Sequence, residues 1–141
     1  TTSSSVKSCS FLGRSPVGGG SSARWEWRRA LAERARQVRG THGLAAVSPT
    51  ATFAVGVRFS LLPRRALGAD LDNLVRPVLN TLFTSRDERS DLTLTGALFG
   101  AEDARIYRLV VEKRVVEDAA REGVEVVVRW EVDGPSDDGS T

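Results

Sequence analysis

Residues 52–61 alternate apolar side chains with small or polar ones. Successive side chains of a strand point to opposite faces, so this run predicts a strand with one face in the core. Residues 124–132 alternate in the same way and predict a second such strand. Weaker patterns at residues 6–12 and 106–116 predict two more strands. The inward-facing positions of the two clear strands are Phe53, Val55, Val57, Phe59, Leu61, Val124, Val126, Val128, Trp130 and Val132.

Two segments show helical spacing instead, residues 23–39 and residues 73–83. In the second, Pro77 is tolerated only near the first turn, where N–H groups lack partners, and this places the helix start near Asn73. The expected apolar faces consist of Trp27, Leu31, Ala35 and Val38 in the first helix and Leu74, Val75, Val78, Leu79 and Leu82 in the second.

The order of these elements predicts one α+β domain over residues 6–133, with a small mixed sheet packed against two main helices. Residues 92–99 are a candidate short strand between the second helix and the strand pattern at 106–116. Residues 1–5 and 134–141 are low in complexity or rich in small polar residues. We therefore expect both ends to be disordered.

Cys and His are scarce in this chain, because Cys9 and His42 are the only residues of their types. Zinc sites built from several Cys and His ligands are therefore excluded. A lone Cys also favours a reducing compartment, and we expect a cytoplasmic protein. The sequence lacks the roughly 18 consecutive apolar residues of a membrane span, so no membrane partner is expected.

Charge is distributed unevenly along the chain. Residues 1–69 carry eleven Lys and Arg against two acids, whereas residues 70–141 carry nine against sixteen. Eighteen of the twenty cations are Arg, which binds phosphate in a bidentate manner. This asymmetry indicates a basic surface for a polyanion beside an acidic region. A compositional bias towards Arg would look the same.

Asp70 and Asp72 stand where the strand pattern gives way to the second helix. If this step is extended, both carboxylates point to one side, and each raises the pKa of the other unless a cation lies between them. A hard divalent ion with oxygen ligands is the simplest such cation. The alternative is helix capping by Asp72 or Asn73. Both interpretations fit the spacing.

The stretch Asp70-Leu-Asp72-Asn-Leu-Val-Arg76-Pro-Val-Leu-Asn80-Thr-Leu82 resembles the D-x-D-N-hydrophobic-x-K-x-hydrophobic-hydrophobic-D-x-L signature of RusA-type Holliday junction resolvases. Two further pieces, in the same order as in the family, strengthen the likeness. Residues 99–113 are similar to the turn with paired acids and the strand after it. Residues 11–17 are similar to the end of the first strand, and a helix with an early Trp follows.

The resemblance implies a homodimeric endonuclease that uses Mg²⁺, with Mn²⁺ as a possible substitute, to cut branched DNA symmetrically. By matching positions, Asp70, Asp72 and Asp103 would bind the metal, and Arg76 would stabilise charge on the phosphate. Asp91 is a rival for the third carboxylate. The expected phosphate contacts of the DNA backbone are Arg14, Arg24, Arg28, Arg29, Arg64 and Arg65.

Several positions depart from the family pattern. Arg76 replaces a Lys, Asn80 replaces an acid, and Glu102 replaces the first Asp of the pair. The usually basic loop after Pro16 reads Gly18-Gly-Gly20. These differences leave open an alternative function, a catalytically impaired RusA-like domain that binds DNA or a protein partner.

Overall fold

The computed structural model describes residues 4–13, 21–48, 50–84 and 95–133. Its one sheet has the strand order β1-β4-β2-β3. β4 pairs antiparallel with both β1 and β2, and β2 pairs parallel with β3. The strands are β1 (Ser4–Gly13), β2 (Phe53–Leu61), β3 (Ile106–Val115) and β4 (Gly123–Asp133). The predicted α+β class with a mixed sheet is confirmed.

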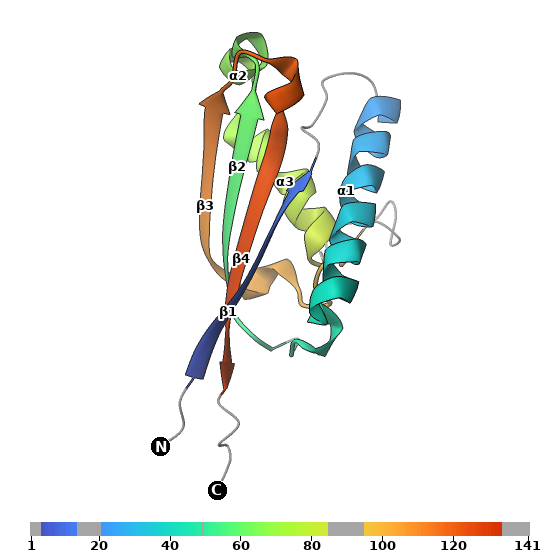
Figure 1. Ribbon diagram of the computed structural model, residues 1–141, viewed down its shortest axis with the longest axis vertical. Helices are drawn as coiled ribbons and strands as arrows, with labels where there is room; N and C mark the ends of the chain where they lie inside the picture. The colour runs from blue at the N-terminus through green and yellow to red at the C-terminus, as the bar shows by residue number, and fades with distance from the viewer. Residues whose placement is uncertain (1–3, 14–20, 49, 85–94, 134–141) are drawn as a thin grey trace, which may run out of the picture.

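In the described ranges, three α-helices accompany the sheet: α1 (Ser21–His42), α2 (Pro63–Gly68) and α3 (Leu71–Leu82). The long helices α1 and α3 cover the same face of the sheet, whereas the short α2 caps the end at which β2 stops (Figure 1). No helix in the described ranges is long and apolar enough to cross a membrane.

The core lies between the sheet and these two helices. The inward positions of β2 and β4 that the structure describes are all buried, as the alternation predicted. The α1 face of Trp27, Leu31, Ala35 and Val38 is buried as well. The periodicity of the sequence therefore predicted correctly which faces of β2, β4 and α1 pack against each other, because the burial of apolar area decides this packing.

An aromatic cluster closes the end of the core near the start of β2. The ring centroid of Phe53 lies 5.1 Å from that of Phe83 and 4.7 Å from that of Phe99, and Trp130 lies 5.2 Å from Phe99. Phe83 and Phe99 flank the connection that follows α3. Their packing fixes where this connection returns to the sheet.

Residues 95–99 do not form the predicted short strand, and residues 92–94 lie outside the described residues. Gly96, Ala97 and Leu98 donate backbone hydrogen bonds to the carbonyls of Phe83, Thr81 and Leu82. Ala97, Leu98 and Phe99 are buried. The segment is apolar because it covers the C-terminal end of α3, not because it joins the sheet.

Other boundaries differ from the expectation at the places where local signals are weak. Ser4 and Ser5, expected to be disordered, pair with Asp133 and Val132 at the start of β1. The short helix α2 was not predicted, although Pro63 at its first position is a typical start signal. The predicted tail from residue 134 lies outside the described residues.

Candidate active site

Asp70 and Asp72 lie at the N-terminal end of α3, directly after α2. Asp70 is the N-cap residue, its backbone is extended, and its side chain makes no capping hydrogen bond. Asp72 lies in the first turn of the helix, so the step between the two acids is not extended, and the extended backbone that would point both carboxylates to one side is absent. The helix begins at Leu71, which is two residues earlier than expected. Capping by Asp72 or Asn73 therefore does not occur, and it does not explain the acid pair.

Both carboxylates are exposed, and within the described part of the chain neither makes a hydrogen bond or an ion pair. Their position is favourable, since the N-terminus of a helix stabilises negative charge. Two unpartnered carboxylates separated by one residue match the oxygen ligands that Mg²⁺ prefers. The chemistry of these two donors suits a hard divalent ion, and among the described residues no third acid, His or Cys joins them.

Lys113 brings a cation to the same place from β3. Its Nζ donates hydrogen bonds to the carbonyl of Ala66 at 2.6 Å and to that of Ala69 at 2.8 Å. Ala69 immediately precedes Asp70, so the ammonium joins β3 to the peptide that leads into the acid pair. The sequence indicates Lys113 only as part of the strand that matches the family. Its pairing with Phe59, whose side chain points into the core, places Lys113 on the helix side of the sheet.

Arg76 lies one turn beyond Asp72 on the exposed stripe of α3, and Asn80 follows as a half-buried residue. Asp72, Arg76 and Asn80 recur at intervals of four, as the sequence predicted. The guanidinium of Arg76 is exposed and lies on the side of the helix that carries Asp72. It is therefore available to a phosphate placed near that carboxylate.

Asp103 lies at the other end of α3. Its backbone N–H donates to the carbonyl of Thr84 at 2.8 Å, and Glu102 forms an isolated bridge with Thr84, two residues after the helix ends. Arg105 donates to the carbonyls of Thr50 and Ala51, which fixes this turn beside the start of β2.

The twelve residues of α3 separate Asp103 from the Asp70–Asp72 pair by about 18 Å at the usual rise of 1.5 Å per residue. Among the described residues no three acids, His or Cys gather into a group that could hold a metal ion. The expected meeting of Asp70, Asp72 and Asp103 therefore does not occur within one chain. The rival Asp91 lies outside the described residues.

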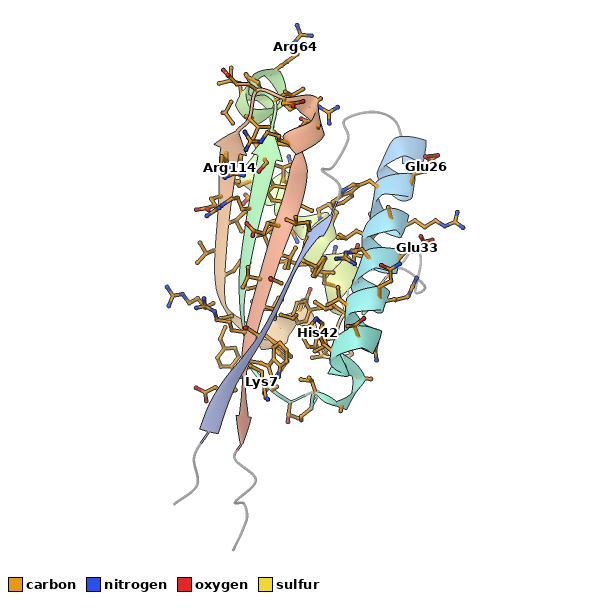
Figure 2. All side chains as sticks on the ribbon, in the orientation of Figure 1. Lys7, Glu26, Glu33, His42, Arg64 and Arg114 are labelled. Atoms are coloured by element: carbon orange, nitrogen blue, oxygen red, sulfur yellow. The ribbon has the colours of Figure 1, made fainter. Side chains whose placement is uncertain are left out.

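The arginines predicted to contact phosphate are in different surroundings. Arg28 is half-buried, and its Nε donates to the Thr81 hydroxyl at 3.0 Å, so it joins α1 to α3. Arg29 is exposed, 4.0 Å from Glu33. Arg65 lies 3.8 Å from Glu122, whereas Arg64 projects from α2 at the end of the molecule that carries the acid pair (Figure 2). Arg14, the side chain of Arg24 and the loop of Gly18–Gly20 lie outside what the structure describes.

A comparison with models of known protein families finds no match for this chain, and no curated protein matches it.

Proposed function

We propose that this chain is a Mg²⁺-dependent endonuclease that cuts branched DNA as a homodimer. The observation that supports the proposal most is the exposed pair Asp70 and Asp72 at the N-terminal end of a helix, without a partner among the residues that the structure describes. Capping does not explain the pair, and its sequence context resembles that of the RusA-type resolvases. Arg76 places an exposed cation on α3, the helix of the acid pair, and Arg64 places another on the preceding helix α2.

A second chain would supply the third carboxylate. One chain holds Asp103 at the end of α3 opposite to Asp70 and Asp72. A two-fold axis perpendicular to α3 near its midpoint would exchange the two ends of the helix. Each Asp103 would then lie at the end where the other chain has its acid pair. The dimer would hold two equivalent sites, which matches the two-fold symmetry of a four-way junction.

Each group in such a site would have a distinct role. When bound, Mg²⁺ lowers the pKa of a water molecule and stabilises charge on the phosphate. Asp70 and Asp72 provide oxygen ligands for it. Arg76 offers a charge-assisted hydrogen bond to the phosphate oxygens. Arg64 contacts the backbone of a neighbouring arm, which gives affinity without sequence preference.

Cleavage of a labelled synthetic four-way junction tests the proposal. With Mg²⁺, the wild type should give paired nicks in opposite strands, and Asp70→Asn and Asp72→Asn should abolish them while junction binding persists. Glu26→Gln on α1 is a matched control, because it removes one exposed negative charge far from α2 and should leave cleavage unchanged. Cleavage that survives both Asp substitutions would contradict the assignment.

A second candidate function is a DNA-binding domain without catalysis. The separation of Asp103 from the other acids within one chain favours it, together with Asn80 and Glu102 at positions where the family has Asp. This candidate predicts salt-dependent junction binding with no cleavage in Mg²⁺ or Mn²⁺. Cleavage by the wild type would exclude it.

A further inference from the structure

The outer edge of β3 is open. β3 is last in the strand order, and no strand in the described ranges pairs with its side away from β2. It is ten residues long and contains no proline, so a full row of backbone N–H and C=O groups is available along this edge. Proteins usually protect long edge strands of this kind, because such an edge is a template for pairing with another strand.

β3 also carries most of the large hydrophobic residues that are exposed in the part of the chain that the structure describes. Of the six large hydrophobic residues that are exposed in the described part of the chain, four lie on β3. Leu109 is 42% exposed and Val110 is 48% exposed, although they point to opposite faces of the sheet. Apolar exposure on both sides of an unpaired strand indicates an interaction site. The other two β3 residues are Tyr107 and Val115.

We propose that β3 pairs antiparallel with β3 of a second copy of this chain, about a two-fold axis that passes by Val110. The two sheets then form one continuous sheet. In this register Val110 lies opposite the partner's Val110, and Leu109 lies opposite the partner's Val111. Arg108 lies opposite the partner's Glu112, and the symmetry repeats this oppositely charged pair on the other side of the axis.

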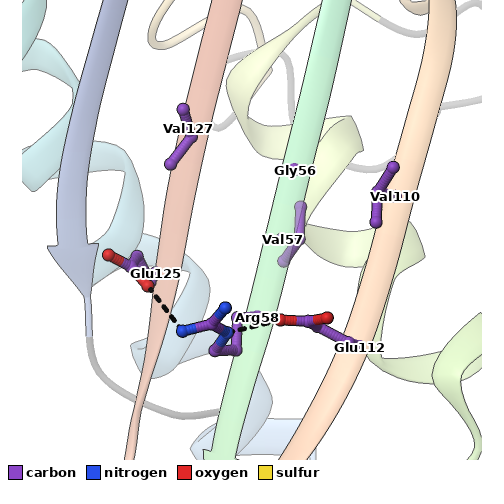
Figure 3. Close-up of a pocket in the computed structure, with 7 residues that line it drawn as sticks. All are labelled: Gly56, Val57, Arg58, Val110, Glu112, Glu125 and Val127. Atoms are coloured by element: carbon purple, nitrogen blue, oxygen red, sulfur yellow. Dashed lines mark hydrogen bonds and ion pairs between the residues drawn. The ribbon is translucent and has the colours of Figure 1, made fainter.

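The charges on the open face of the sheet select this register. Arg58 of β2 lies between two acids, with its Nε 2.5 Å from Glu112 and its Nη1 3.8 Å from Glu125 (Figure 3). Pairing at Val110 adds the partner's Arg108 on the outer side of Glu112, so opposite charges alternate across the junction.

Neighbouring registers are less favourable. An axis at Val111 would place Arg108 opposite the partner's Arg114, and an axis at Glu112 would place two carboxylates opposite each other. An axis at Leu109 would place Arg108 and Glu112 opposite apolar residues and so lose both oppositely charged pairs. Like charges directly opposite each other destabilise a strand pair.

The pairing of β3 does not depend on the proposed function. Its consequence for the acids, which follows here, does rest on that function. β3 starts near Asp103 and ends near Lys113, which contacts the residue before Asp70. Antiparallel pairing places the start of one β3 beside the end of the other. Each Asp103 therefore lies at the end of the paired sheet where the partner has its acid pair.

Charge reversal at the interface, followed by analytical ultracentrifugation, tests the pairing. Arg108→Glu alone and Glu112→Arg alone should each weaken self-association about tenfold, since each places two like-charged pairs across the axis. The double variant Arg108→Glu/Glu112→Arg should restore it. Arg129→Glu, on the same face but on β4, is the matched control and should leave self-association unchanged. Thermal unfolding of each variant verifies that it is folded.

Cross-linking with a short bismaleimide gives an independent test. Val110→Cys should yield a covalent dimer, whereas the wild type, whose Cys9 is buried, should yield none. Val127→Cys, which lies on the inner strand β4, should also yield none. A monomer at all concentrations, charge variants that stay fully dimeric, or cross-linking through Val127→Cys instead would overturn the pairing. Dimers that pair through β3 but do not cut junctions would refute the proposed function and leave the interface intact.

Discussion

The Lys113 ammonium joins the end of β3 to the peptide that precedes Asp70. Lys113→Met removes two charge-assisted hydrogen bonds and keeps a side chain of similar length. The side chain is exposed, so water can replace part of what is lost, and we expect unfolding to become easier by about 1 kcal/mol. Urea unfolding measures this change. Lys7→Met is the matched control, because Lys7 is exposed on β1, and it should change stability little.

We also expect the loss of Lys113 to weaken metal binding at the acid pair. Without the two bonds, Ala69 and Asp70 lose their link to β3, and Asp70 becomes less well positioned. Titration with Mn²⁺ should therefore show weaker binding to Lys113→Met than to the wild type, whereas Lys7→Met should bind like the wild type. Equal Mn²⁺ affinity in all three proteins would show that Lys113 does not position the acid pair.

Cys9 lies in the core on β1, and burial raises the pKa of its thiol from 9.0 to about 11. The unfolded chain releases this proton at a lower pH than the folded chain does. The contribution of Cys9 to stability is therefore complete below about pH 9 and is lost as the pH rises towards about 11, at up to about 1.4 kcal/mol per pH unit. Cys9→Ala should lose less stability over this range. Urea unfolding at a series of alkaline pH values measures the difference, and identical profiles would contradict it.

At the level of elements, the segment after α3 decides where Asp103 lies. Gly96 has a φ of +68°, and a Cβ at this position would approach the Thr84 Cγ2 to 2.9 Å. Gly96→Ala should therefore destabilise the protein by about 1–3 kcal/mol, through both the left-handed backbone and the close contact. Gly100→Ala is the control, since a Cβ added at Gly100 would meet nothing within 4 Å. Thermal unfolding should show a change of less than about 0.5 kcal/mol for this control.

Periodicity predicted the elements whose faces are set by burial. β2 and β4 alternate because one face of each packs under the helices, and α1 shows its buried stripe at helical spacing. Residues 95–99 could not be predicted in this way. They are apolar like a strand, but their backbone groups bind the end of α3, and a contact of this kind leaves no period in the sequence. The early start of α3 could not be predicted, because Pro77 indicated a later helix start.

For the whole molecule, the candidate site divides into a local part and a distant part. The Asp70–Asp72 pair could be predicted because its two acids are neighbours in sequence and sit at a change of pattern. Its distance from Asp103 depends on the direction of α3 between β2 and β3, which spacing does not encode. The sequence alone therefore suggested one site per chain, whereas the fold separates the acids by the length of a helix.

Mixing two inactive variants tests whether the acids meet between chains. Asp70→Asn and Asp103→Asn should each be inactive alone in Mg²⁺. If each site takes its acid pair from one chain and Asp103 from the other, a mixed dimer carries both substitutions in one site and none in the other. Random exchange of subunits then leaves about a quarter of all sites intact, so the mixture should regain about a quarter of the nicking rate.

The pattern of nicks adds a second criterion to this test. A mixed dimer has one intact site, so it should cut one strand of the junction and leave the opposite strand whole, whereas the wild type should cut both. If all the acids of a site came from one chain, neither variant would contain a complete set, and mixing would restore nothing. The same mixture made in the Arg108→Glu background should recover less activity, because this substitution weakens the β3 pairing through which the two chains would complete each other's sites.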